Sequence, residues 1–113
     1  LAKVASGDAA AAPVHRILRM ATLNGAMALG LGDTVGSLVP GKAADLCSIR
    51  LDDWPGQPCY DPASHVIHVA GREQVSHVWV DGRLRICNGM PVGVSPNRLI
   101  DLAKSWHNSI RLD

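Results

Sequence analysis

The chain has 113 residues, of which 47% are hydrophobic and 19% charged, and its formal net charge is +1. This composition is typical of a globular protein, and the length suits one ordinary domain. Charges of both signs are interspersed, which excludes the basic surface expected of a protein that binds nucleic acid or an anionic membrane.

The first third of the chain is predicted to be helical. Residues 1–12 are interpreted as the end of a helix that stops at Gly7, followed by a linker of small residues. A better-marked helix begins at Pro13 and ends at Gly30 and Gly32. Its apolar residues lie on more than one side, so we expect it to have neighbours on more than one side.

The next segment is predicted to form a pair of strands. Residues 35–39 and 44–51 flank Pro40-Gly41, a pair that suits the centre of a type II turn. After a loop rich in proline, Asp61 and Pro62 predict the start of a short helix over residues 63–70, which would end at Gly71. A strand is the alternative for that segment.

A second pair of strands is predicted over residues 75–80 and 83–87. Asp81-Gly82 between them suits the mirror-image turn of a two-residue hairpin, and Asn88-Gly89 predicts a further turn. The four strands would make only part of a sandwich, and open sheet edges are normally covered or paired. We therefore expect something else to lie beside them.

A closing helix is predicted after residue 94. Ser95 caps it and Pro96 begins it, and its apolar residues fall on one stripe: Leu99, Leu102, Ala103, Trp106 and Ile110.

The ends and the cysteines give two further expectations. The sequence begins at Leu1 without an initiator Met or a secretion signal, so we expect a fragment of a longer protein. No stretch approaches the roughly 20 apolar residues of a membrane span, so we expect a soluble protein. The three cysteines are most simply explained as reduced thiols, so we expect a cytoplasmic protein. Cys47, Cys59 and Cys87 form no C-x-x-C pair, which argues against a disulfide framework or a zinc site. Cys47 and Cys87 are interpreted as buried apolar residues of strands.

The histidines do not form a recognisable catalytic pattern. The nearest approach to a metal motif is His65-x-x-His68, and two partly exposed histidines in a connecting segment are the favoured interpretation. His15 and His107 have no carboxylate nearby in sequence. His77 shares a strand face with Val75 and Trp79, where a hydrogen-bonded sheet histidine is favoured over a general base.

Other candidate motifs are also interpreted as structural. Gly30-x-Gly32 follows a helix where a dinucleotide fingerprint needs a strand, and there is no G-x-S-x-G elbow. Asp45 is predicted to accept bonds from local backbone amides. Asn24 is predicted to bond the backbone of an adjacent element. No catalytic, metal or substrate-binding residue is therefore assigned.

Three phrases in order resemble the C-terminal third of the amidohydrolase superfamily: Ala21-Thr22-Leu23-Asn24-Gly25-Ala26, then Val35-Gly36-Ser37-Leu38 with Pro40-Gly41-Lys42-Ala43-Ala44-Asp45-Leu46, then Val78-Trp79-Val80-Asp81-Gly82-Arg83. Two further segments are most similar to the 5-methylthioadenosine/S-adenosylhomocysteine deaminases: Cys59-Tyr60-Asp61-Pro62-Ala63-Ser64-His65 and the run from Ala70 to Val80.

This resemblance implies an α/β parent protein, with a (β/α)₈ barrel and a composite β-sandwich, of which this chain is an α+β portion. Residues 1–32 would be the last helices of the barrel, 33–94 the C-terminal part of the sandwich and 95–113 a closing helix. The resemblance also implies a divalent metal, zinc or iron, that activates water for attack at the purine C6. The metal ligands and proton-handling groups would all precede Leu1.

The resemblance thus predicts a non-catalytic C-terminal part of a deaminase, inactive by itself. Its partners would be the N-terminal part of the same protein, a small-molecule substrate of the parent and, as an option, further copies. Two alternatives remain open. The parent could instead act on another heterocycle, such as 8-oxoguanine, guanine or a triazine, or the chain could be a small β-rich interaction module without chemistry.

Overall fold

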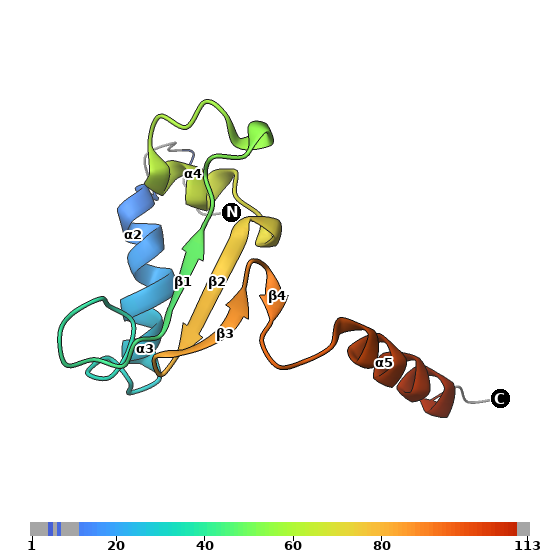
Figure 1. Ribbon diagram of the computed structural model, residues 1–113. Helices are drawn as coiled ribbons and strands as arrows, with labels where there is room; N and C mark the ends of the chain where they lie inside the picture. The colour runs from blue at the N-terminus through green and yellow to red at the C-terminus, as the bar shows by residue number, and fades with distance from the viewer. Residues whose placement is uncertain (1–4, 6, 8–11, 111–113) are drawn as a thin grey trace.

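A computed structural model describes residues 5, 7 and 12–110 of the chain, apart from the side chain of residue 55. These residues form a small α+β unit in which a helix and a short second helix lie on one side of an open antiparallel sheet, as Figure 1 shows. A third helix projects beyond the last strand. The predicted helix end over residues 1–6 and the linker after it fall largely outside the described residues.

The predicted helix after Pro13 is confirmed. It runs through three consecutive segments: α2 (Val14–Arg19), the π-helical η1 (Met20–Asn24) and α3 (Gly25–Ala28). Gly30 ends it in the left-handed region with φ 71°, and the Leu31 amide donates to the Ala26 carbonyl over 2.8 Å. Glycine adopts the left-handed conformation more readily than other residues. This Schellman-type end therefore explains why the helix stops where the sequence predicts.

The predicted strand over residues 35–39 is wrong, because this segment folds against the helix as a loop. Gly36 has a φ of 87°, and a Cβ built on it would lie 2.8 Å from the Ala26 Cβ. The Ala43 amide closes the loop by donating to the Thr34 carbonyl over 2.9 Å. The predicted turn at Pro40-Gly41 does form, since Gly41 has a φ of 94°, but it does not join two strands.

The sheet has four antiparallel strands in the order β1-β2-β3-β4: β1 (Leu46–Ile49), β2 (Val75–Val80), β3 (Arg83–Cys87) and β4 (Met90–Pro91). The predicted hairpin between β2 and β3 is confirmed, with Asp81 at φ 51° and Gly82 at φ 70°. Leu46 pairs with Trp79, so β1 pairs with a strand far along the chain rather than with a neighbouring hairpin arm. The strand β4 was not predicted.

The connection between β1 and β2 contains the predicted short helix, α4 (Pro62–His68), flanked by two 3₁₀ turns, η2 (Trp54–Gly56) and η3 (Arg72–Gln74). Asp61 caps α4 by accepting from the Ala63 and Ser64 amides, so the helix is confirmed and the strand alternative is excluded. The helix ends at His68, two residues earlier than predicted, and it packs against α2.

The last helix, α5 (Pro96–Ile110), lies beyond β4 and away from α2 and α4 (Figure 1). Of the described hydrophobic residues, Ala26 alone is buried. The accessible surface is 8990 Å², against about 6,000 Å² for a compact monomer of this mass. The radius of gyration is 18.2 Å, against about 13 Å for a compact domain of this length. This unit therefore leaves much of its apolar surface without a covering layer.

Candidate functional site

The histidines are spread over four elements: His15 on α2, His65 and His68 on α4, His77 on β2 and His107 on α5. Within residues 5, 7 and 12–110, no group of three or more His, Cys, Asp or Glu side chains could hold a metal ion. The described residues therefore do not fit the divalent metal that the resemblance implies, and no chemical step of this part of the chain passes through one.

His65 is not partly exposed as predicted. It is 7% exposed and supports the loop before α4, while His68 on the next turn is exposed. A Cβ built on Gly56 would lie 2.7 Å from His65 Nε2 and 3.1 Å from Asp53 Oδ1. Gln74 Nε2 donates to Asp53 Oδ2 over 2.8 Å. These contacts fix the loop at residues 53–56 against α4 and give His65 a structural role.

His77 takes part in a hydrogen-bonded chain on the sheet. Its Nδ1 lies 3.1 Å from Ser76 Oγ, which in turn lies 2.6 Å from Ser48 Oγ. The ring of His77 stacks on Trp79 with 5.6 Å between ring centroids, which confirms that the two share a face. Because Ser76 is buried, this chain joins β1 to β2 and does not present an accessible nucleophile.

Two hydrogen bonds join the segment at Ala44-Asp45 to the hairpin turn at Asp81-Gly82. The Asp81 amide donates to Asp45 Oδ1 over 2.6 Å, so Asp45 accepts from a backbone amide as predicted, but this amide lies 36 residues away and is not local. That amide belongs to the hairpin turn between β2 and β3, and the Gly82 amide donates to the Ala44 carbonyl over 3.1 Å. Asp45 and Asp81-Gly82 thus form one structural contact between segments distant in sequence.

Lys42 holds the loop after α3 closed. Its Nζ donates to the Gly32 carbonyl and, over 3.3 Å, to the Val35 carbonyl. Sequence reasoning assigned it no role, although its place directly after the Pro40-Gly41 turn is a usable signal. Two of the three N–H donors of the ammonium group bind backbone carbonyls of this loop, which gives this lysine a structural role.

Among the described residues, two carboxyl groups have shifted pKa values, and both lie on the surface. The Ser64 hydroxyl, with the amides of Ser64 and Ala63, holds the pKa of Asp61 below its usual value, and the nearby His15 adds a small effect. The pKa of Glu73 is lowered by its own amide and by Arg72, whose Nε lies 3.1 Å from Glu73 Oε1. Helix capping and a surface ion pair explain both shifts, so neither marks a catalytic acid or base.

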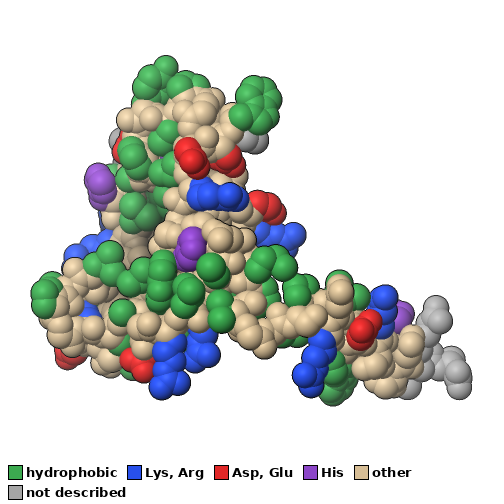
Figure 2. All heavy atoms as spheres, in the orientation of Figure 1, with side chains coloured by type: hydrophobic (Ala, Val, Ile, Leu, Met, Phe, Trp, Pro, Cys, Tyr) green, Lys and Arg blue, Asp and Glu red, His purple; other side chains and the backbone are tan. Residues whose placement is uncertain are grey.

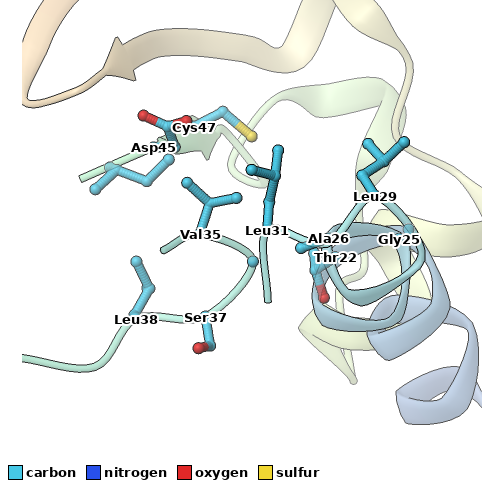
Figure 3. A pocket seen from close by; sticks show the side chains of 13 residues that line it. Thr22, Gly25, Ala26, Leu29, Leu31, Val35, Ser37, Leu38, Asp45 and Cys47 are labelled. Carbon is cyan, nitrogen blue, oxygen red and sulfur yellow. The ribbon is translucent and has the colours of Figure 1, made fainter. Parts of the chain in front are cut away.

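An apolar groove of about 590 Å³ lies between the helix, the following loop and β1 (Figure 3). Its walls are mostly small or aliphatic, and Asp45 and Cys47 face it from the sheet side. Thr22 already donates to the Leu18 carbonyl of its own helix, and Asp45 binds the hairpin turn. Because the lining is mostly apolar and both Thr22 and Asp45 are engaged elsewhere, the groove suits packing against apolar side chains rather than acid–base chemistry.

Two further predictions from the sequence are wrong. Cys47 is exposed rather than buried, because it faces the open groove instead of a covered core. Asn24 is exposed on η1, and no side-chain hydrogen bond joins it to another described residue. Cys87, which was also predicted to be buried, is only half-buried, as is Cys59, and both are free thiols.

Hydrophobic side chains gather on the visible face of the sheet and at the tip of the loop above it (Figure 2). In that loop, Trp54 is 87% exposed and Tyr60 is 92% exposed. The exposed apolar surface is thus distributed over the helix, the groove, the loop and α5 rather than concentrated in one pocket.

Among the described residues, no helix is both long and apolar enough to span a membrane.

Comparison with known proteins identifies relatives along most of the chain. The amidohydrolase family profile matches residues 1–85. The 5-methylthioadenosine/S-adenosylhomocysteine deaminase of Teredinibacter turnerae is 37% identical over 108 residues, which are 96% of this chain and 24% of that protein. The enzyme of the same name from Syntrophobacter fumaroxidans is 40% identical over 84 residues, 74% of this chain and 19% of that protein. The chain thus spans a quarter or less of these two relatives.

Two solved structures show the same arrangement. An adenosine deaminase from Xanthomonas campestris with bound zinc is 38% identical, with a TM-score of 0.92 over 96% of this chain and 25% of its own. An atrazine chlorohydrolase from Arthrobacter aurescens complexed with zinc is 32% identical, with a TM-score of 0.76 over 83% of this chain and 20% of its own.

Proposed function

This chain belongs to the amidohydrolase family, and we propose that it is the C-terminal part of a metal-dependent deaminase that acts on an adenine-type nucleoside. The parent enzyme, meaning the longer protein that contains this chain, would remove the amino group from purine C6 of 5-methylthioadenosine or S-adenosylhomocysteine and release ammonia. The metal, its ligands and the proton-handling groups would lie in the rest of the parent enzyme, since the described residues offer no such set. The role of this chain is structural.

One contrast among the relatives carries the choice of substrate class. Two relatives named as deaminases, one of 5-methylthioadenosine/S-adenosylhomocysteine and one of adenosine, reach 37–38% identity over 96% of this chain, and others reach 33–43% over 67–83%. The chlorohydrolase reaches 32% over 83%, with the lower TM-score of 0.76. Two of the deaminases are thus similar over more of this chain than the chlorohydrolase is, which favours a nucleoside over a triazine.

The geometry supports a covering role for the rest of the parent enzyme. The sheet edge at β1 is open, the groove beside it is apolar, and most large hydrophobic side chains remain exposed. We infer that residues 12–32 close the helical layer of a barrel and residues 33–94 form part of a composite sandwich. An independent interaction module would instead be expected to bury its own core.

The test is an assay of the parent enzyme, loaded with zinc, against a panel of substrates. We expect ammonia release from 5-methylthioadenosine, S-adenosylhomocysteine or adenosine, no ammonia from guanine or 8-oxoguanine, and no chloride from atrazine. The 113-residue chain alone serves as the control and should release none. Turnover of only a triazine or a guanine base would overturn the substrate class, and activity in the chain alone would overturn its structural role.

A further inference from the structure

Helix α5 has an apolar stripe with no partner among the described residues. Leu99, Leu102, Trp106 and Ile110 follow one another at spacings of three and four residues, and each is between 48% and 66% exposed. The opposite side of the helix is polar, with Asn97, Asp101, Lys104 and Asn108 at matching spacings. The helix therefore presents one face that is built to be buried.

The helix needs such burial in order to persist. It has fifteen residues, and isolated helices shorter than about 12–15 residues are marginal in water even when they are rich in alanine. Trp106, His107, Asn108 and Ser109 are weaker helix formers than alanine. Most of the stability of this helix must then come from packing of its apolar face.

The projecting position of α5 is retained in a solved relative. The Xanthomonas campestris adenosine deaminase superposes on 96% of this chain with a TM-score of 0.92. The remaining 4% amounts to about five of the 113 residues. Even if all five lay in α5, ten of its fifteen residues would still be matched. In that protein the remaining three quarters of the chain are present, since the match covers 25% of it.

The distribution of exposed apolar residues favours one large occupant over a second copy of the chain. They lie at the end of the first helix (Met27, Leu29), on the loop (Trp54, Tyr60) and on α5 (Trp106), which are separate parts of the surface in Figures 1 and 2. A two-fold dimer contact uses one self-complementary patch on each subunit. A body about three times the size of this chain can cover several parts at once.

We propose that the apolar stripe of α5 docks on the preceding part of the same polypeptide and fastens the C-terminal unit to the rest of the parent enzyme. This inference rests on the proposed function, because that function supplies the preceding part. Leu99, Leu102, Trp106 and Ile110 form the contact, and the face with Lys104 and Asn108 remains in water. The contact involves no catalytic group, so its loss loosens the unit before it changes the chemistry.

The experiment compares two variants of the parent enzyme that each introduce a carboxylate on α5. Trp106→Asp places it on the stripe, and Asn108→Asp places it two residues further on, on the polar face. We measure hydrogen exchange of the α5 amides together with the oligomeric state by light scattering. Trp106→Asp should speed α5 exchange by about tenfold or more, and Asn108→Asp should leave it unchanged. Leu102→Ala is the milder variant if Trp106→Asp does not fold.

Three outcomes would overturn the proposal. The α5 amides could exchange in the wild-type enzyme as fast as those of an unstructured peptide, or both carboxylate variants could behave alike. Protection of α5 that disappears as a dimer dissociates on dilution would assign the stripe to a second copy. Deaminase activity is read separately: a protected α5 in an enzyme that deaminates no nucleoside supports the docking and overturns only the proposed function.

Discussion

Helices α4 and α5 begin with similar sequence signals but have different surroundings. An Asp or Ser precedes a proline at each start, and the Asp61 and Ser95 carbonyls accept from the His65 and Leu99 amides. The seven-residue α4 packs against α2 and buries His65, whereas the fifteen-residue α5 buries none of its residues. Local signals therefore predict where a helix begins, while the covering of its apolar face depends on chain far away in sequence.

This difference divides the molecule into a body, residues 12–91, which is held by its own polar contacts, and the projecting α5. Changes in the body should destabilise the parent enzyme whether or not α5 is docked. Their effects should therefore add to those of changes on α5, to within about 0.5 kcal/mol. Gly36, Lys42 and Asp61 all belong to the body, and the effect of replacing each is measured on the parent enzyme.

The largest effect is expected from Gly36→Ala. A Cβ at this position would lie 2.8 Å from the Ala26 Cβ and 3.0 Å from the Leu23 Cα, and the φ of 87° is itself unfavourable for alanine. Overpacking and backbone strain together should lower the free energy of unfolding by about 3 kcal/mol, measured by urea denaturation.

The matched control for Gly36→Ala is Gly41→Ala. Gly41 also has a positive φ, 94°, but nothing lies within 4 Å of its Cβ position. In this variant the free energy of unfolding should fall only by the contribution of backbone strain, about 1 kcal/mol. Equal losses in the two variants would contradict close packing of the loop on the helix. A loss at Gly36 that vanishes when Leu102→Ala is also present would contradict the division between body and α5.

A smaller effect is expected from Lys42→Met. The substitution keeps the aliphatic length but removes the donor to the Gly32 and Val35 carbonyls. We expect a loss of about 1–2 kcal/mol in the free energy of unfolding, because the partly buried carbonyls lose a charged donor. Lys104→Met on the polar face of α5 is the control and should change stability by less than about 0.5 kcal/mol. An unchanged Lys42→Met variant would show that the loop closes without this contact.

The smallest effect is expected from Asp61→Ala, and it should depend on pH. The folded pKa of Asp61 is lowered by the Ser64 hydroxyl and the amides that it caps. The carboxylate therefore stabilises the folded state fully above the usual Asp pKa of about 3.9, and less as the pH falls through the lowered value. The wild type should have a higher urea midpoint of unfolding than Asp61→Ala at pH 6, and the two midpoints should become equal at acid pH. The control Asp52→Ala should show no such difference from wild type, and a difference for Asp61→Ala that widens in acid would refute the capping role.

The turns and helix starts were predictable because each depends on a few adjacent residues. Asp81-Gly82 adopts the two positive φ angles that its hairpin requires, and Asp61-Pro62 begins α4. Gly30 ends the first helix for the same reason. In each case the preference belongs to the residue itself, so no distant contact was needed to read it.

The strand pairing and the buried histidine were not predictable, because both depend on distant contacts. Residues 35–39 precede a Pro-Gly turn as a hairpin strand would, but Gly36 lies against Ala26, and β1 pairs with β2 instead. His65 looks like a surface residue in its own segment and is buried because Gly56 leaves room for its ring. The lack of a metal-ligand pattern could be read from the sequence. The apolar groove could not, because it forms only when the loop folds against the helix.

The contact between Asp45 and the Asp81 amide fixes one end of the β1–β2 ladder directly at the hairpin turn. The register of Leu46 opposite Trp79 is thus set without reference to the 25 or so residues that connect the two strands. Insertions or deletions at the exposed tip of that connection, near Tyr60, would change only a slowly varying loop-closure entropy, about 0.6 kcal/mol for each doubling of loop length. This makes the tip a region where related proteins can diverge in length while the sheet keeps its alignment.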